Sequence, residues 1–171
     1  MSFILTQNLC LRSLTEEDIP VWHRWFNDPR VTQYMDKGQF PSTPEKQHDF
    51  LNTLRCCKTT LQLGIEHQNK LIGIIGLHSI THLHQRADIS ILIGDPLSWG
   101  KNFATEAIEA IVSHAFCKLN LIKLTAGAVV ENKGSVKAFK KNGFIEEGLF
   151  KKDLFVNGNH HDTIKLALFK S

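Results

Sequence analysis

The stretch from residue 89 to residue 116 constrains the fold more than any other part of the chain. The apolar run Ile89 to Ile93 has the length of a buried strand, and a loop containing Gly94 and Gly100 follows it. Beyond the loop, apolar residues recur at the i, i+3, i+4, i+7 spacing of a helix that buries one face: Ala104, Ala107, Ile108, Ile111, Val112, Ala115 and Phe116. The stretch therefore predicts a strand, a loop and a helix in that order.

The loop before this helix is suited to binding an anion. A helix start presents unpaired backbone N–H groups and the positive end of the helix dipole, which favour phosphate. An ordinary helix start has the same pattern, so both interpretations stay open here. A Walker A loop is disfavoured, because five residues separate Gly94 from Gly100 and Asn102 stands where that motif has Ser or Thr. A Rossmann G-x-G-x-x-G motif is also absent from the sequence.

Composition predicts an ordinary folded protein. The 171 residues are 42% hydrophobic and 22% charged, and we expect one domain spanning 1–171. The net charge of +3 is compatible with an acidic ligand but does not indicate nucleic acid, because no basic cluster alternates with aromatic residues. The densest basic run, Lys137 to Lys141, is expected on the solvated side of a helix.

Cysteine and histidine usage predicts neither a disulfide framework nor a metal site. None of the four cysteines forms a C-x-x-C motif, and neither a signal peptide nor a long apolar run is present, so we expect a cytoplasmic protein without membrane contact. The histidine pairs at 82/84 and 160/161 lack partners at usual metal-ligand spacing, so we expect no metal.

Periodicity and turn signals predict an α+β (mixed α/β) fold. Strands are expected at residues 3–12 (as one strand or a hairpin), 59–66, 70–80, 86–93, 121–130, 144–152 and 161–169. Helices are expected from Thr15 until Pro29 stops the first, from Thr43 to Cys57, at 103–119 and from Ser135 to Gly143. Asn157-Gly158 predicts a hairpin turn. Residues 30–43 have no clean period and contain aromatic residues, so they form either a packed surface loop or one wall of a substrate cleft.

Several blocks resemble the GCN5-related N-acetyltransferase (GNAT) family. Residues 99–107, Trp-Gly-Lys-Asn-Phe-Ala-Thr-Glu-Ala, are similar to its pyrophosphate loop, which in the Rim-type branch reads W-G-x-G-x-A-T-E-A. That branch contains ribosomal-protein N-terminal acetyltransferases and their relatives. Four further blocks fit it in the right order: Leu11-Arg12-x-Leu14, Trp25-x-Asn27-Asp28, residues 131–148 with Asn132, Ser135 and Asn142-Gly143-Phe144, and residues 155–162 with Asn157-Gly158 and Asp162. The resemblance covers nearly the whole chain.

The resemblance implies a fold and an activity. The fold would be a central, mostly antiparallel sheet of about seven strands flanked by about four helices, splayed between the strand ending at Ile93 and the strand at 121–130. The activity would be acetyl transfer from acetyl-CoA, by direct attack of a primary amine of a protein N-terminus, a polyamine or an amino sugar. A monomer or a homodimer is expected.

The resemblance also implies a cofactor site. Backbone N–H groups of Ile91, Leu92 and Ile93 would bind pantetheine and the thioester oxygen, although these residues also read as ordinary buried strand. The pyrophosphate would contact residues 99–104, which are Trp99, Gly100, Lys101, Asn102, Phe103 and Ala104. Lys101 adds charge or simply faces solvent. Asn132 would hydrogen-bond the cofactor or serve as a turn residue, and Phe139 would line its site.

At two positions the sequence departs from the family pattern in a way that affects catalysis. Asn102 replaces the second glycine of the family loop, although Asn tolerates a left-handed conformation. Phe139 stands about where many members carry a tyrosine general acid, and phenylalanine cannot donate a proton. Ser135 is the implied substitute acid, or else a helix N-cap. The departures also leave room for an alternative function, a catalytically weak acyl-CoA-binding regulatory module.

The general base is the least defined role. Asp88 lies where relatives often have a glutamate, and it would act through water on the substrate ammonium. It is also compatible with a surface strand position, with Asp88 outward and Ile89 inward. Secondary candidates are His82, His84, His161 and Asp162.

Overall fold

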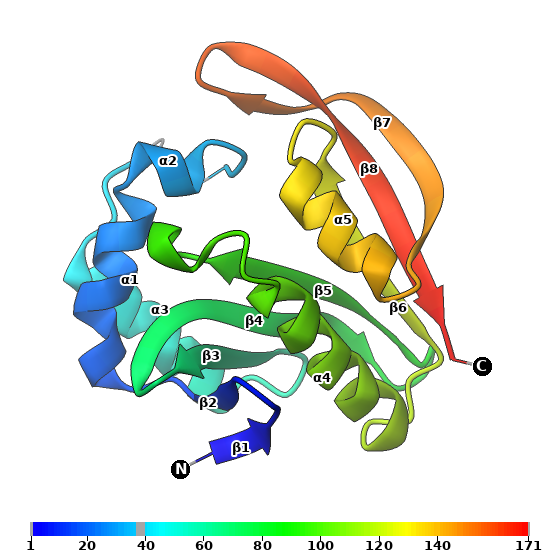
Figure 1. Cartoon of the computed structure of the whole chain (residues 1–171), viewed down its shortest axis with the longest axis horizontal. Coiled ribbons are helices and arrows are strands. Elements are labelled where there is room, and N and C mark those ends of the chain that lie inside the picture. The colour runs from blue at the N-terminus through cyan, green and yellow to red at the C-terminus, as the bar shows by residue number, and fades with distance from the viewer. Residues whose placement is uncertain (1, 37–39, 171) are drawn as a thin grey trace.

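All strands in the described part of the chain belong to one twisted sheet (Figure 1). The structure is a computed structural model that describes residues 2–36 and 40–170. The strand order is β1-β2-β3-β4-β5-β6-β8-β7. The strands are β1 Ser2–Leu5, β2 Cys10–Ser13, β3 Leu61–His67, β4 Lys70–Thr81, β5 Arg86–Ile93, β6 Lys123–Val129, β7 Ile145–Val156 and β8 Asn159–Phe169. The helices are α1 Ile19–Phe26, α2 Pro29–Thr32, α3 Pro44–Cys56, α4 Phe103–Cys117 and α5 Lys133–Lys141.

The sheet splits at its centre. Every neighbouring pair is antiparallel except β5 and β6, which are parallel. These two strands are paired only from Arg86–Lys123 to Asp88–Thr125, after which they separate, while β6 stays paired to β8 along its whole length. The predicted mixed α/β fold and the splay between these two strands are therefore confirmed.

Local signals placed most element ends. Thr15 and Asp18 form the expected capping box, and the Thr43 hydroxyl accepts a hydrogen bond from the Lys46 N–H. Asn157 and Gly158 both have positive φ and form the two-residue turn between β7 and β8.

The element count differs slightly from the expectation. The described residues form eight strands instead of about seven, because residues 3–12 hold the hairpin β1–β2. They form five α-helices instead of about four, because Pro29 occupies the first turn of α2, where its missing N–H costs nothing. The stretch 30–43 thus begins inside a helix, and its Gly38 lies outside the described residues. The hairpin β7–β8 is longer than expected at both strands (Figure 1).

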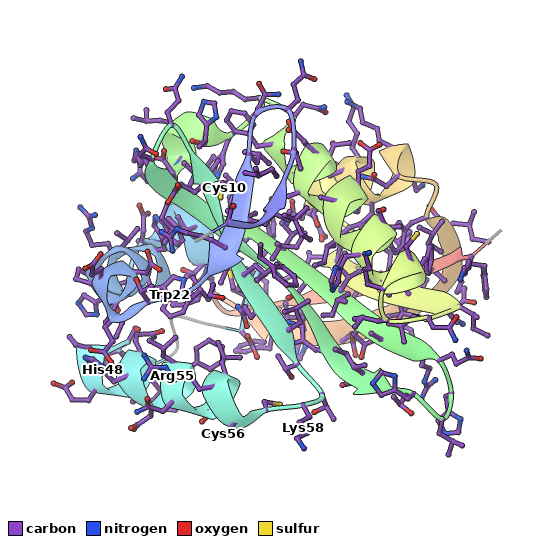
Figure 2. The ribbon with its side chains drawn as sticks, turned by 90° about the horizontal axis from the view of Figure 1, so that it is seen from below. Cys10, Trp22, His48, Arg55, Cys56 and Lys58 are labelled. Atoms are coloured by element: carbon purple, nitrogen blue, oxygen red, sulfur yellow. The ribbon has the colours of Figure 1, made fainter. Side chains whose placement is uncertain are left out.

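Helices cover both faces of the sheet. On one face, Ile89 of β5 packs in a core with α4 residues such as Ala107 and Ile111 and with Phe139 of α5. On the other face, Ile74 of β4 packs with residues of α1 and α3. Trp22 of α1, labelled in Figure 2, is fully buried there, and its ring meets Phe50 of α3 edge-on at 5.9 Å. The strands at the split therefore have a different core on each side.

None of the helices in the described ranges has the length and apolar character needed to cross a bilayer. The organisation of the chain as one domain stays a prediction.

Candidate active site

A cavity of about 670 Å³ opens where β5 and β6 separate. Its walls come from both faces of the sheet. They include β5 from Ile89 to Ile93, the loop and first turn of α4, α5, the end of β6, the segment 30–35 around α2, and the middle of β7 and β8. The cavity thus connects the α4–α5 side of the sheet to the α1–α2 side through the split.

The open edge of β5 supplies backbone hydrogen-bond donors to this cavity. The Gly94 N–H donates to the Ile72 carbonyl of β4. Successive N–H groups along a strand point to opposite edges, so those of Ile93 and Ile91 face away from β4 and into the split. The Ile93 carbonyl also faces this way, because it accepts a hydrogen bond from the Trp99 indole at 2.7 Å. This edge is therefore suited to bind an extended amide-containing ligand as an added strand.

The loop after β5 is held by packing and by one carboxylate. A Cβ atom at position 94 would lie 2.1 Å from the Trp25 ring, so only glycine fits there. The Asp95 carboxylate binds Lys70 and the Ser98 hydroxyl, and it accepts from the Leu97 N–H. Desolvation opposes ionisation of Asp95, but these hydrogen bonds outweigh it and lower the pKa of the carboxyl. These contacts hold the loop between β5 and α4 against β4 and α1.

The loop ends in two residues with left-handed backbone conformations. Gly100 has a φ of +73° and Asn102 a φ of +67°. No side chain among the described residues caps the first turn of α4, and none of the N–H groups of residues 100–105 donates a hydrogen bond within that part of the chain. Uncapped N–H groups at a helix start form an anion site.

Side chains around the cavity add positive charge. Lys137 and Lys141 of α5 lie one helical turn apart and line the cavity beside the α4 start, with Arg30 and Lys165 farther along. The Lys141 ammonium donates to the Asn102 side-chain oxygen at 3.0 Å. Lys137 and Lys141 are exposed on α5, as expected for the solvated side of a helix, and docking of α5 beside the split makes them line the cavity as well.

The start of α5 corrects one sequence alternative. Asn132 is the N-cap, since its side-chain oxygen accepts from the Ser135 N–H at 3.2 Å. Ser135 therefore lies inside the first turn and is not the N-cap. Both residues line the cavity, as does Phe139, which is buried and meets Phe144 edge-on. Ser135 thus lines the cavity from the first turn of α5.

The candidates for the general base lie outside the cavity lining. Asp88 is exposed with Ile89 buried, as the strand alternation predicted, and its carboxylate accepts from the Thr125 hydroxyl across the last paired position. Asp88 and Lys101 are the two predicted site residues that do not line the cavity, and their roles stay predictions. The secondary candidates His82, His84, His161 and Asp162 also lie outside its lining.

Asp162 stabilises an irregular segment of β7. Its carboxylate binds the Lys151 ammonium and the Lys152 N–H, where Lys152 has a φ of +52°. The pairing of β7 with β8 shifts register here, so the segment is a bulge. The bulge brings Asp153 and Leu154 to the cavity wall.

Sequence reasoning missed several wall residues. They are Ser90, Asp153, Leu154, Thr163 and Lys165. The stretch 30–43 was expected to be either a packed surface loop or one wall of a cleft, and its residues Tyr34 and Met35 do line the cavity. The residues of β7 and β8 had no signal, because the fold alone brings them to the split.

An open β edge beside an uncapped, cation-flanked helix start defines a protein that binds an extended anionic ligand through a splayed sheet. Comparison with known proteins gives the class. A profile of the acetyltransferase (GNAT) domain matches residues 8–145. The chain is 31% identical to the N-acetyltransferase YoaA of Bacillus subtilis strain 168, over 96% of this chain and 95% of that protein.

Two further relatives are informative. The putative ribosomal N-acetyltransferase YdaF of the same organism is 32% identical over 64% of this chain and 60% of its own length. The crystal structure of spermidine N-acetyltransferase from Vibrio cholerae in complex with CoA and spermine superposes with a TM-score of 0.88, at 27% identity over 96% of both chains. This chain belongs to the GNAT family of acetyltransferases.

Proposed function

We propose that this chain is an N-acetyltransferase that moves the acetyl group of acetyl-CoA to a primary amine by direct attack. The observation that carries the proposal is the cavity at the split, which extends from the uncapped start of α4 to the segment around α2. One side would hold the cofactor, and the other would admit the amine. The relative from Vibrio cholerae, solved in complex with CoA and spermine, supports a cofactor and an amine in one fold of this shape.

The cofactor would bind along the open edge and the loop. The N–H groups of Ile91 and Ile93 would pair with pantetheine and stabilise the thioester oxygen as negative charge develops. The backbone from Trp99 to Ala104 would hold the pyrophosphate, and Lys137 and Lys141 would neutralise part of its charge. Asn102 fits this arrangement, because its side chain already binds Lys141 at the loop.

The transfer requires proton movements at both ends of the reaction. The thioester supplies an activated acyl carbon when the cofactor is bound. The amine must lose a proton before it attacks, and the departing thiolate must gain one. Ser135, which lines the cavity, would protonate the thiolate, since Phe139 cannot. Asp88 is our candidate for assisting the deprotonation of the amine.

The acceptor is a primary amine of a protein N-terminus, a polyamine or an amino sugar. Among the described residues that line the cavity, Asp153 is the single carboxylate, whereas Arg30 and Lys165 are cations that the proposed cofactor site does not use. A polyamine carries several positive charges, so this lining favours an acceptor with one ammonium group.

The test is an acceptor screen monitored by release of free thiol from acetyl-CoA. We expect turnover with at least one of a peptide with a free N-terminus, glucosamine and spermidine. Ser135→Ala should lower kcat at least about tenfold while calorimetry finds CoA binding unchanged. Tight CoA binding without turnover of any amine would instead favour the acyl-CoA-binding regulatory module, and absence of CoA binding would contradict both functions.

A further inference from the structure

One polar pair beside the split has no role in the mechanism above. The Nε2 atom of His78 on β4 lies 2.7 Å from the Ser90 hydroxyl oxygen on β5. The two strands are antiparallel, with Gly76 opposite Ser90 and His78 opposite Asp88, so these side chains share one face of the sheet. It is the α1–α3 face, because Ile74, two residues before Gly76, packs in that core.

A glycine makes room for the contact. A Cβ atom at position 76 would lie 3.0 Å from His78 Nε2 and 3.3 Å from its Cε1. The imidazole therefore extends over the Gly76 backbone to reach Ser90, instead of pointing straight out from the sheet. In this position the Nε2 atom of His78 points at the Ser90 hydroxyl.

Ser90 places that hydroxyl at the split. It is exposed and lines the cavity, and it immediately precedes Ile91, whose N–H faces the open edge. On this face of the sheet, the cavity wall continues into Tyr34 and Met35 beyond α2. Ser90 is therefore on the side where the proposed function brings in the amine, opposite the loop that would hold the cofactor.

The environment of His78 suits a proton acceptor. Burial lowers the pKa of the half-buried imidazole, and the charge of Asp88, the ionised group opposite it on β5, offsets part of that shift. The ring is consequently neutral at neutral pH. The Asp88 carboxylate is in turn held by the Thr125 hydroxyl of β6, so the four groups lie in the order Ser90, His78, Asp88, Thr125 across three strands.

We propose that Ser90 takes the proton from the acceptor ammonium and passes its own hydroxyl proton to Nε2 of His78. The amine leaves this step neutral, Ser90 regains a hydroxyl, and His78 becomes an imidazolium that faces Asp88. No other reactant is required. Ser90 is the catalytic residue because it faces the amine, whereas His78 acts through it as a positioning residue and proton store. The assignment rests on the proposed function and gives Asp88 an indirect role.

The experiment compares Ser90→Ala and His78→Gln with the wild-type chain. His114→Gln is the matched control, because His114 is also half-buried with its pKa lowered by burial, yet it lies on α4 away from the cavity lining. For each variant, CoA binding is measured by calorimetry. Values of kcat/KM are then measured from pH 6 to 9 with whichever of the N-terminal peptide, glucosamine and spermidine the wild-type chain acetylates.

We expect kcat/KM at pH 7 to fall at least about 100-fold in Ser90→Ala and in His78→Gln, with CoA binding unchanged. The ratio of wild-type to His78→Gln activity should shrink about tenfold per pH unit towards the pKa of the acceptor, because the variant uses only amine that is already neutral. His114→Gln should match the wild type throughout.

The proposal is overturned if both site variants keep kcat/KM within about threefold of wild type. It is also overturned if the loss in His78→Gln is the same at every pH, since a purely structural defect would not depend on the amine. Failure of the wild-type chain to acetylate any amine would count against the proposed function, and it is recorded before any variant is compared.

Discussion

Lys141 at the end of α5 donates a hydrogen bond to the side-chain oxygen of Asn102, the residue just before α4, at 3.0 Å. The contact joins two elements that are 39 positions apart in the chain. It also explains how a residue other than glycine fits the family's loop. Asn accepts the left-handed conformation, and its side chain turns to a lysine at the rim of the cavity.

Replacing Asn102 tests the backbone requirement. Asn102→Gly should leave the free energy of unfolding within about 1 kcal/mol of wild type, because glycine adopts a positive φ without strain. Asn102→Val should weaken CoA binding about tenfold, because a β-branched residue costs roughly 1–2 kcal/mol at this φ and displaces the loop amides. Thermal unfolding and calorimetry measure the two effects. Equal CoA affinity in the two variants would show that the loop conformation does not control binding.

The lysines on α5 should contribute charge to cofactor binding. Lys137→Met and Lys141→Met are each expected to raise the Kd for CoA about three- to tenfold, with a smaller effect in high salt because added ions screen the attraction. Lys140→Met is the control, since Lys140 pairs with Glu146 and lies outside the cavity lining. Calorimetric titrations at two salt concentrations measure the Kd for CoA of each variant. A similar loss in all three variants would indicate only a general effect of net charge.

The pKa of His78 should respond to Asp88. Burial lowers this pKa and the Asp88 charge raises it, so Asp88→Asn should lower it further. An NMR titration of the imidazole Cε1–H resonance measures the shift directly, without substrate. An unchanged midpoint in Asp88→Asn would mean that the carboxylate does not act on the ring.

An ion pair near the start of α1 should make the stability of the protein depend on pH. Burial disfavours the Asp18 carboxylate, but hydrogen bonds from Arg12 at 2.8 Å and from Thr15 outweigh it and lower the pKa. A lowered folded-state pKa stabilises the protein above the unfolded pKa, and this contribution is lost as pH falls through the folded pKa. Asp18→Asn should therefore cost about 2 kcal/mol at pH 7 and progressively less below about pH 4.

Urea unfolding of both proteins between pH 3 and pH 7 measures that difference. Arg55 and Glu16 provide a comparison, because both partners of this ion pair are exposed and Glu16→Gln should change stability by less than about 1 kcal/mol at any pH. A constant gap between wild type and Asp18→Asn down to pH 3 would assign the loss to packing instead of charge.

Much of the fold could be predicted because its signals are local. Thr15 and Thr43 cap helices through contacts three residues away, and Asn157-Gly158 closes a two-residue turn. Signals were weak where short elements lacked a period. The four residues of α2 are too few to display one, and the pattern of residues 3–12 left a single strand and a hairpin both open.

The candidate site likewise contains some residues that local sequence predicted and others that it did not. Trp99 to Ala104, Asn132 and Ser135 were identified from blocks of sequence, and all of these except Lys101 line the cavity. The N-cap alternative for Ser135 was wrong because Asn132, three residues earlier, already occupies that position. Ser90 and His78 carried no signal, since an isolated serine or histidine on a strand is common and their contact exists only across two paired strands.

The sequence by itself determined the order of the elements, the loop at the start of α4 and the family, because periodicity, caps and motifs act over a few residues. The tertiary structure alone decided where β5 separates from β6, which lysines of α5 reach the cavity and which hydroxyl group lies within hydrogen-bond distance of an imidazole. Those contacts depend on strand register and helix docking between segments far apart in the chain. The opening stretch thus predicted a loop suited to an anion, and the packing around it determined which groups surround that loop.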